Sequence, residues 1–285
     1  MSNQLSSKPV SMDFNNGNGI AAHFYHANGF PLEIYSGLLT KLSQHLNLSA
    51  LALRPTWPNI GLPPKQRSWQ IYADDLIDFL ERQNKGPVIG IGHSMGATCT
   101  VLAAKKRPDL FKSLVLIEPA MVSSAVALLV RIFPKAFVNL FNPAKNALKK
   151  PDKWDSRQAF LSYCKQFRGY KRFDDEMFSL LAKYGVTETR NGQYQLSFPK
   201  IWEAHNYTQP PNLMTSLEKL KMPCIAIRGK PSIFVTESIW QEWRSRCPHF
   251  LFKENLDYGH LFPLENPSAC YDILSEALTE LSLMG

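Results

Sequence analysis

Residues 92–96 read Gly-His-Ser-Met-Gly, a serine with one glycine two positions before it and another two positions after it. The apolar residues 88–91 before this motif are typical of a buried parallel strand, and residues 97–106 after it predict a helix. A serine at such a strand-to-helix turn has an exposed hydroxyl, and the flanking glycines keep Cβ atoms out of the crossing point. The pattern predicts that Ser94 is a nucleophile.

Ser94 needs a base, because a free serine hydroxyl is a poor nucleophile at neutral pH. His260 is the candidate, since it lies in a Gly-His loop shortly after a predicted strand at residues 250–252. Four other histidines are weaker candidates. His23 lies inside a predicted strand, and His45 lies at a helix end. His93 is the variable residue of the serine motif, and His205 lies in an inserted segment where a structural role is expected. The developing oxyanion also needs a donor already in place, and the N–H of Met95 at the start of the following helix fits this role.

Strands and helices that alternate along the chain must position these residues. Sheet strands are predicted at residues 20–25, 48–53, 88–91, 113–117 and 224–227, and helices at 31–46, 68–83, 97–106 and 267–281. Residues 10–14 and 20–25 read either as a hairpin or as two sheet strands across a tight turn. The alternation predicts a mainly parallel sheet with helices on both faces, where ligands bind at the carboxyl ends of the strands.

Residues 121–212 interrupt this alternation and are mostly helical. Candidate helices lie at residues 124–133, 135–148, 155–167 and 174–184, followed by a small hairpin at 187–198. We therefore divide the chain into a core, residues 1–120 and 213–285, and a cap, residues 121–212. The cap is rich in apolar residues at 125–133, Phe137, Phe141 and Trp154, which either line a pocket for a hydrophobic acyl or aromatic group or simply pack the core of the cap. It is also basic, and its cations either attract acidic substrates or form a solvated face: Lys149, Lys150, Lys153, Lys165, Arg168, Lys171 and Arg172.

The serine motif, the Gly259-His260 loop and the Glu265-Asn266-Pro267 segment follow one another in an order that resembles the α/β-hydrolase family. The resemblance spans nearly the whole chain, from about residue 20 to residue 283. It implies an α/β-hydrolase fold with a helical cap inserted between two sheet strands, and a catalytic pair formed by Ser94 and His260. Haloalkane dehalogenases and the related epoxide hydrolases need an aspartate where Ser94 stands, so those reactions are not expected.

A carboxylate should complete the triad, because the second nitrogen of the histidine needs a partner that fixes its tautomer. Many members of the family carry an aspartate after the strand that ends here at Gly229, but residues 229–234 contain no acid. Some members carry the acid one strand earlier, where this chain has Glu118, and we assign the role to Glu118. Glu237 stays open as the alternative.

The second oxyanion donor is expected in the loop after the strand at residues 21–25. This loop reads His-Ala-Asn-Gly-Phe-Pro and is similar to the H-G-x-P loop of the family, with Asn28 in place of its histidine. The resemblance assigns the second donor to the N–H of Phe30. It leaves open whether His26 braces the loop instead of the missing histidine.

The bulk composition is that of a globular protein of 285 residues, 45% hydrophobic and 20% charged, with a net charge of +8. No nucleic-acid motif accompanies the charge, so we expect surface character and no nucleic-acid partner. The five cysteines have no paired spacing and indicate a reducing compartment. Residues 1–18 lack the apolar segment of a signal peptide, and the apolar run at 126–133 is too short to span a bilayer. The sequence therefore predicts a cytoplasmic protein without a transmembrane segment.

These observations together predict a serine hydrolase of the carboxylesterase class that acts on a small-molecule substrate through an acyl-enzyme. No cofactor is required, and neither a metal-ligand cluster nor a phosphate-binding loop is visible. The sequence leaves open whether the bond is an ester, a thioester, a lactone, an amide or a carbon–carbon bond, and whether the enzyme is a cofactor-free perhydrolase. A non-catalytic binding protein of the same fold is the alternative, and the oligomeric state is open.

Overall fold

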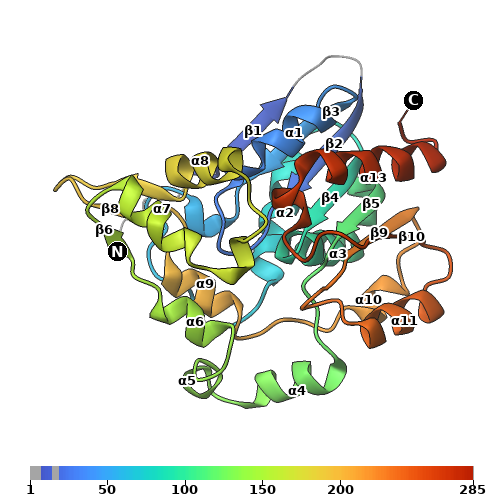
Figure 1. The fold of residues 1–285 in the computed structure, drawn as a ribbon. Helices are drawn as coiled ribbons and strands as arrows, with labels where there is room; N and C mark the ends of the chain where they lie inside the picture. Colours follow the sequence, from blue (N-terminus) through green and yellow to red (C-terminus); the bar gives the residue numbers. More distant parts are fainter. Residues whose placement is uncertain (1–7, 15–18, 285) are drawn as a thin grey trace.

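A seven-stranded sheet forms the centre of the computed structural model, which describes residues 8–14 and 19–284 (Figure 1). Its strand order is β1-β3-β2-β4-β5-β9-β10. β1 runs antiparallel to β3, and all other neighbouring strands are parallel, as the sequence predicts. The strands are β1 (Ser11–Phe14), β2 (Ile20–Tyr25), β3 (Leu46–Leu51), β4 (Val88–His93), β5 (Phe111–Ile117), β9 (Cys224–Gly229) and β10 (Leu251–Asn255).

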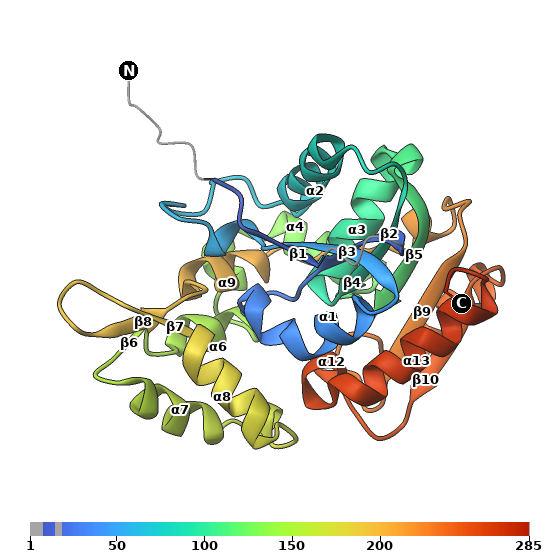
Figure 2. The ribbon, with the colours of Figure 1, turned by 90° about the horizontal axis from the view of Figure 1, so that it is seen from above.

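Helices cover both faces of this sheet, which explains why β4 and β9 consist of buried residues throughout. α2 and α3 pack together on one face, and α1 and α13 pack together on the other (Figure 2). The helices of this part of the chain are η1 (Leu32–Tyr35), α1 (Ser36–Leu42), η2 (Arg54–Thr56), α2 (Gln70–Gln83), α3 (Met95–Lys106), η3 (Pro108–Leu110), α11 (Glu237–Arg246), α12 (Phe262–Glu265) and α13 (Pro267–Glu280). This arrangement confirms the predicted fold class.

The first strands differ in detail from the prediction. β1 pairs with β3, so segments 10–14 and 20–25 are two sheet strands and not a hairpin; residues 15–18 of the expected turn lie outside the described residues. The helix predicted at 31–46 is wrong at its end, because α1 stops at Leu42. Leu46 and Leu48 are fully buried as part of β3, where they pair with β2, and this burial outweighs continuation of the helix.

Most of the segment between β5 and β9 lies beside the sheet as a group of helices, coloured green to light orange in Figure 1. It also contains a small three-stranded sheet of order β6-β8-β7, which includes the predicted hairpin. Its elements are α4 (Ser124–Ile132), α5 (Lys135–Val138), α6 (Ala144–Lys149), β6 (Lys153–Trp154), α7 (Arg157–Lys165), η4 (Arg168–Tyr170), α8 (Asp175–Tyr184), β7 (Val186–Glu188), β8 (Tyr194–Leu196), α9 (Lys200–Asn206) and α10 (Met214–Leu217). The division into a core and a cap at residues 121–212 stays a prediction.

One predicted cap helix is wrong in extent. Residues 135–148 form two short helices, α5 and α6, instead of one. Pro143 lies at the break, and proline has no N–H with which to continue a helical hydrogen-bond ladder. Within the described residues, all five cysteines are buried and free, and none of the helices has both the length and the apolar character that crossing a bilayer requires.

Candidate active site

Ser94 lies at the sharp turn between β4 and α3, with φ 53° and ψ −119°. Such a positive φ is uncommon for a residue with a side chain and costs backbone energy. The two flanking glycines make the turn possible. A Cβ atom on Gly96 would lie 2.1 Å from the carbonyl oxygen of Tyr25, and one on Gly92 would lie 2.4 Å from the Cα of Ala97. The steric reason that the sequence gives for both glycines is therefore confirmed.

His260 lies between Ser94 and Glu118 and contacts both side chains. The Nε2 atom of His260 lies 2.9 Å from the Oγ of Ser94, and its Nδ1 atom lies 3.0 Å from Oε2 of Glu118. Three segments that are far apart in the sequence supply these side chains: the β4–α3 turn, the end of β5 and the loop after β10. This is the order of groups in which a histidine can take a serine proton while a carboxylate holds its other nitrogen.

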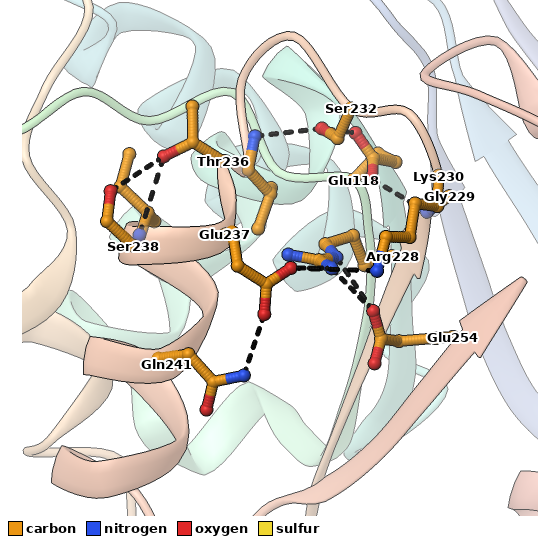
Figure 3. Close-up of polar contacts among 12 residues, drawn as sticks. Glu118, Arg228, Gly229, Lys230, Ser232, Thr236, Glu237, Ser238, Gln241 and Glu254 are labelled. Atoms are coloured by element: carbon orange, nitrogen blue, oxygen red, sulfur yellow. Dashed lines mark hydrogen bonds and ion pairs between the residues drawn. The ribbon is translucent and has the colours of Figure 1, made fainter. Parts of the chain in front are cut away.

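Glu118 is fully buried, and its backbone also has a positive φ, of 48°. Besides facing His260, its carboxylate accepts hydrogen bonds from the backbone N–H of Gly229 at 2.7 Å and from the hydroxyl of Ser232 at 2.5 Å (Figure 3). Ser232 lies in the loop that carries no acid, and sequence reasoning missed its contact. The one sequence signal for the contact between Ser232 and Glu118 is a small polar residue in the loop where many family members have an aspartate.

Glu237, the alternative acid, lies elsewhere. Its carboxylate accepts hydrogen bonds from Gln241 at 2.8 Å and from the buried Arg228 at 2.6 Å, as Figure 3 shows. These two bonds, in this order, lower the pKa of Glu237 to about 2. Within the described residues Glu237 makes no contact with His260. The structure thus brings Glu118, and not Glu237, to the histidine, and the catalytic role of Glu118 stays a prediction.

Met95 follows Ser94 directly in the chain, and Phe30 lines the same recess as Ser94. Met95 is the first residue of α3, and Phe30 follows Gly29, whose φ is +83°. Neither N–H donates to another group within the part of the chain that the structure describes. Two free amides near a nucleophile can stabilise an oxyanion, so their predicted role is open to test.

Asn28 and His26 share the bracing of the Phe30 loop. The Asn28 amide donates to the carbonyl of Glu203 at 3.1 Å and accepts from Asn206 at 2.8 Å, which fastens the loop to α9. The Nε2 atom of His26 accepts from the N–H of Leu53 at 2.7 Å, which fastens the loop to the end of β3.

His93 connects two loops of the site, a role that sequence reasoning missed. Its Nε2 donates to the carbonyl of His260 at 2.8 Å, and its Nδ1 accepts from the hydroxyl of Tyr35 at 2.7 Å. The Tyr35 oxygen in turn accepts from the N–H of Ala27 at 3.3 Å. The variable position of the serine motif thus links the loop of His260 to the loop of Phe30, and no local pattern marks such a long-range link.

Acid should destabilise the protein through its buried histidines. Burial lowers the pKa of His23, His26 and His93 to about 3 each, whereas a histidine of the unfolded chain titrates near 6.5. Between these values the unfolded state binds a proton that the folded state does not, so stability falls as the pH drops below about 6.5. The expected slope is about 1.4 kcal/mol per pH unit for each histidine, or about 4 kcal/mol for the three.

Urea unfolding at pH 7.5, 5.5 and 4.5 measures this slope. His23→Gln should reduce this slope by about 1.4 kcal/mol per pH unit, because this one group no longer titrates. The exposed His249→Gln is the matched control and should leave the slope as it is. A free energy of unfolding that stays level from pH 7.5 to 4.5 would contradict the prediction.

Two cavities meet at Ser94. The first has a volume of about 300 Å³ and an apolar wall, and the second has a volume of about 570 Å³ and a wall that includes six charged side chains. We call them the apolar cavity and the basic chamber. Asn28, Ser94 and Phe234 line both, Met95 lines only the apolar cavity, and His260 lines only the basic chamber.

The predicted lining residues of the cap are found in part. Phe137, Phe141 and four residues of the predicted helix 124–133 line the apolar cavity: Val126, Leu129, Val130 and Phe133. Trp154 is not among them; it packs against Phe160 with ring centroids 4.9 Å apart. His205 lines neither cavity and accepts a hydrogen bond from Lys135, in agreement with the structural role expected for it. In the described part of the chain, no group of three side chains gathers that could hold a metal ion.

Comparisons with known proteins extend over most of the chain. A family model described as "Alpha/beta hydrolase family" matches residues 20–273. Among solved structures, that of E-2-(acetamidomethylene)succinate hydrolase superposes with a TM-score of 0.74 at 19% identity, covering 95% of this chain and 100% of the other.

Several curated proteins match by sequence, among them the following two. "Probable alcohol acetyltransferase" of Cyberlindnera fabianii is 23% identical over 230 residues, which are 76% of this chain and 60% of that protein. 2-(Acetamidomethylene)succinate hydrolase of Mesorhizobium japonicum is 31% identical over 105 residues, which are 36% of each chain. The matches cover less than two thirds of the length of either relative.

Proposed function

This chain belongs to the alpha/beta hydrolase family, and from this premise we propose that it is a serine hydrolase that cleaves a carboxylic ester through an acyl-enzyme on Ser94. The observation that carries the proposal is the contact chain from the Ser94 hydroxyl through His260 to Glu118, with distances of 2.9 Å and 3.0 Å. A cavity on each side of Ser94 leaves room for the two halves of an ester.

In the proposed first step the Ser94 oxygen attacks the acyl carbon while Nε2 of His260 takes the serine proton. Glu118 accepts from Nδ1 of His260, which holds the ring in the tautomer whose Nε2 is free to act as base, and stabilises the imidazolium that forms. The negative charge that develops on the carbonyl oxygen is met by the N–H groups of Met95 and Phe30. Each such donor contributes roughly 10²- to 10³-fold to the rate.

In the proposed second step Nε2 of His260 returns the proton to the departing alcohol oxygen as the tetrahedral intermediate collapses. The acyl group stays on Ser94. A water molecule then enters on the side of His260, loses a proton to Nε2 and attacks the acyl carbon, and the carboxylic acid leaves as Ser94 recovers its proton.

These steps assign one cavity to each half of the substrate. The leaving oxygen must lie within reach of Nε2 of His260, and His260 lines only the basic chamber. The acyl group then occupies the apolar cavity, whose wall comes largely from residues 122–144. We propose on this ground that residues 121–212 act as the cap, and that the cap selects the acyl group.

A series of 4-nitrophenyl esters tests the function and the acyl assignment together. From acetate to octanoate, kcat/KM should rise about fourfold per methylene, because each buried methylene contributes about 0.8 kcal/mol. Val126→Trp fills the cavity and should move the preference toward short chains. Leu128→Trp on the same helix is the control, since Leu128 is exposed and lies outside the cavity wall.

A flat profile would contradict the acyl assignment, and no turnover of any ester would favour the non-catalytic alternative. Transfer of the acyl group to an alcohol is a second candidate, favoured by the similarity to a protein named as an alcohol acetyltransferase. It uses the same acyl-enzyme, with an alcohol in place of water. Adding ethanol to the assay and measuring the ethyl ester by gas chromatography separates the two outcomes.

A further inference from the structure

The basic chamber holds more positive than negative charge. Four cationic side chains line it, against two carboxylates: Lys150, Arg168, Lys171 and Arg172 against Glu203 and Glu265. An excess of one sign on the wall of a recess attracts and holds ligands of the opposite sign.

Two of the four cations are already neutralised. The Nζ of Lys150 lies 2.7 Å and 2.8 Å from the two oxygens of Glu203, which is buried. Nη1 of Arg172 lies 3.7 Å from Oε2 of Glu265, a carboxylate that also accepts from the N–H of Gly259 beside the histidine. The first pair lies within the cap, the second joins the cap to the core, and both leave little charge for a ligand.

Arg168 and Lys171 are the unpaired cations. Neither forms an ion pair or a side-chain hydrogen bond with any residue in the described ranges, 8–14 and 19–284. Both are exposed and both line the chamber. The two charges are therefore available to a bound anion.

The turn that carries them is anchored against the site. Tyr170, between the two cations, lies with its ring centroid 6.1 Å from that of Phe30 and is stacked on Phe173 at 4.8 Å. The 3-10 turn η4 thus rests on the loop that holds one of the proposed oxyanion donors. A charged side chain on an anchored turn meets a ligand at a defined place and loses less entropy on binding than one on a mobile loop.

We infer that the substrate is an ester or thioester whose leaving alcohol or thiol carries an anionic group, a carboxylate or a phosphate, which Arg168 and Lys171 bind. The inference rests on the proposed function, because the leaving group is assigned to the basic chamber by its need to reach His260. The acyl half stays uncharged, in keeping with the apolar wall of the other cavity.

Matched esters test this inference. 4-Nitro-3-(octanoyloxy)benzoate, with a charged leaving group, should have a kcat/KM about tenfold above that of its uncharged methyl ester, mainly through KM. The 4-nitrophenyl monoester of suberic acid places the charge on the acyl side and should be poorer than 4-nitrophenyl octanoate. S-Octanoyl-4′-phosphopantetheine against S-octanoyl-pantetheine repeats the comparison for phosphate on the same thioester bond.

The charge-reversed variant Arg168→Glu/Lys171→Glu should lose the tenfold preference and keep its activity on the uncharged ester within about twofold. Arg168→Gln/Lys171→Gln removes the charges without reversing them and should give an intermediate loss. Lys105→Glu/Lys221→Glu makes the same change of net charge at exposed positions outside the chamber and should keep the preference. The wild-type preference should also shrink from 0.1 M to 1 M salt, as the Debye length falls from about 10 Å to about 3 Å.

Equal kcat/KM for charged and uncharged leaving groups in the wild type would overturn the inference, and so would an equal loss in the control variant. Hydrolysis of the uncharged ester measures the proposed function separately. An enzyme that cleaves it without any preference for charge refutes the inference alone, whereas an enzyme that cleaves none of the esters refutes the function.

Discussion

Replacement of Ser94 by alanine should lower kcat for 4-nitrophenyl octanoate by about 10⁴- to 10⁶-fold. The variant keeps both cavities and both proposed oxyanion donors but lacks the oxygen that becomes acylated. The remaining rate should come from substrate binding and the oxyanion donors alone. The fold should persist, because alanine removes one atom from a turn whose geometry is fixed by the two glycines.

Labelling with a fluorophosphonate makes this result independent of the substrate. The wild-type protein should be labelled at Ser94, and the Ser94→Ala variant should not react. Adding His260→Gln to Ser94→Ala should cause little further loss, because groups that act as a unit are not additive. Ser113→Ala is the matched control, since Ser113 is buried in the neighbouring strand β5 and its hydroxyl has no partner among the described residues. Full activity of Ser94→Ala would remove the serine from the mechanism.

Replacement of Glu118 by glutamine should lower kcat by about 10²- to 10⁴-fold with little change in KM. The amide has nearly the same shape as the carboxylate, but it cannot stabilise the imidazolium, and it favours the wrong tautomer of His260. Glu237→Gln is the control, because that carboxylate pairs with Arg228 and should matter less than about twofold for kcat.

The Ser232 hydroxyl offers a second test of the same idea. It lies 2.5 Å from the Glu118 oxygen that faces His260, so an aspartate at 232 could occupy nearly the same place. Glu118→Ala/Ser232→Asp should therefore recover at least tenfold of the activity lost in Glu118→Ala. If Glu118→Gln is as active as the wild type, or Glu237→Gln is as impaired as Glu118→Gln is expected to be, the assignment of the acid is wrong.

The sequence predicts those parts of the site that depend on local geometry. Ser94 and its two glycines form a motif because the turn is short, and each glycine has a steric cause within a few residues or in the adjacent strand. The alternation of strands and helices likewise predicts the sheet, because burial on both faces demands continuous apolar strands. The sequence predicts the wrong end for α1, because Leu46 pairs with β2 and so belongs to a strand, and this pairing is a long-range contact.

The parts that could not be predicted depend on contacts between distant segments. Nothing near His93 indicates that its ring joins Tyr35 to the carbonyl of His260, because these residues meet only in the folded sheet. The pairing of Lys150 with Glu203 is equally invisible, so the sequence shows a basic cap but not which cations are free. The break at Pro143 differs from these cases, because a proline inside a predicted helix is a local signal that the helix is interrupted there.

The meeting of two separate cavities at Ser94 has a kinetic consequence under the proposed mechanism. The first product can depart through the basic chamber while the acyl chain remains seated on the other side, so the reaction should follow ping-pong order. The vacated chamber then gives the second reactant a route to the acyl-enzyme on the side of His260. If water enters the basic chamber first, the acyl group is hydrolysed, and if an alcohol enters first, the acyl group is transferred. The relative occupancy of the chamber by water and alcohol would therefore set the ratio of hydrolysis to transfer.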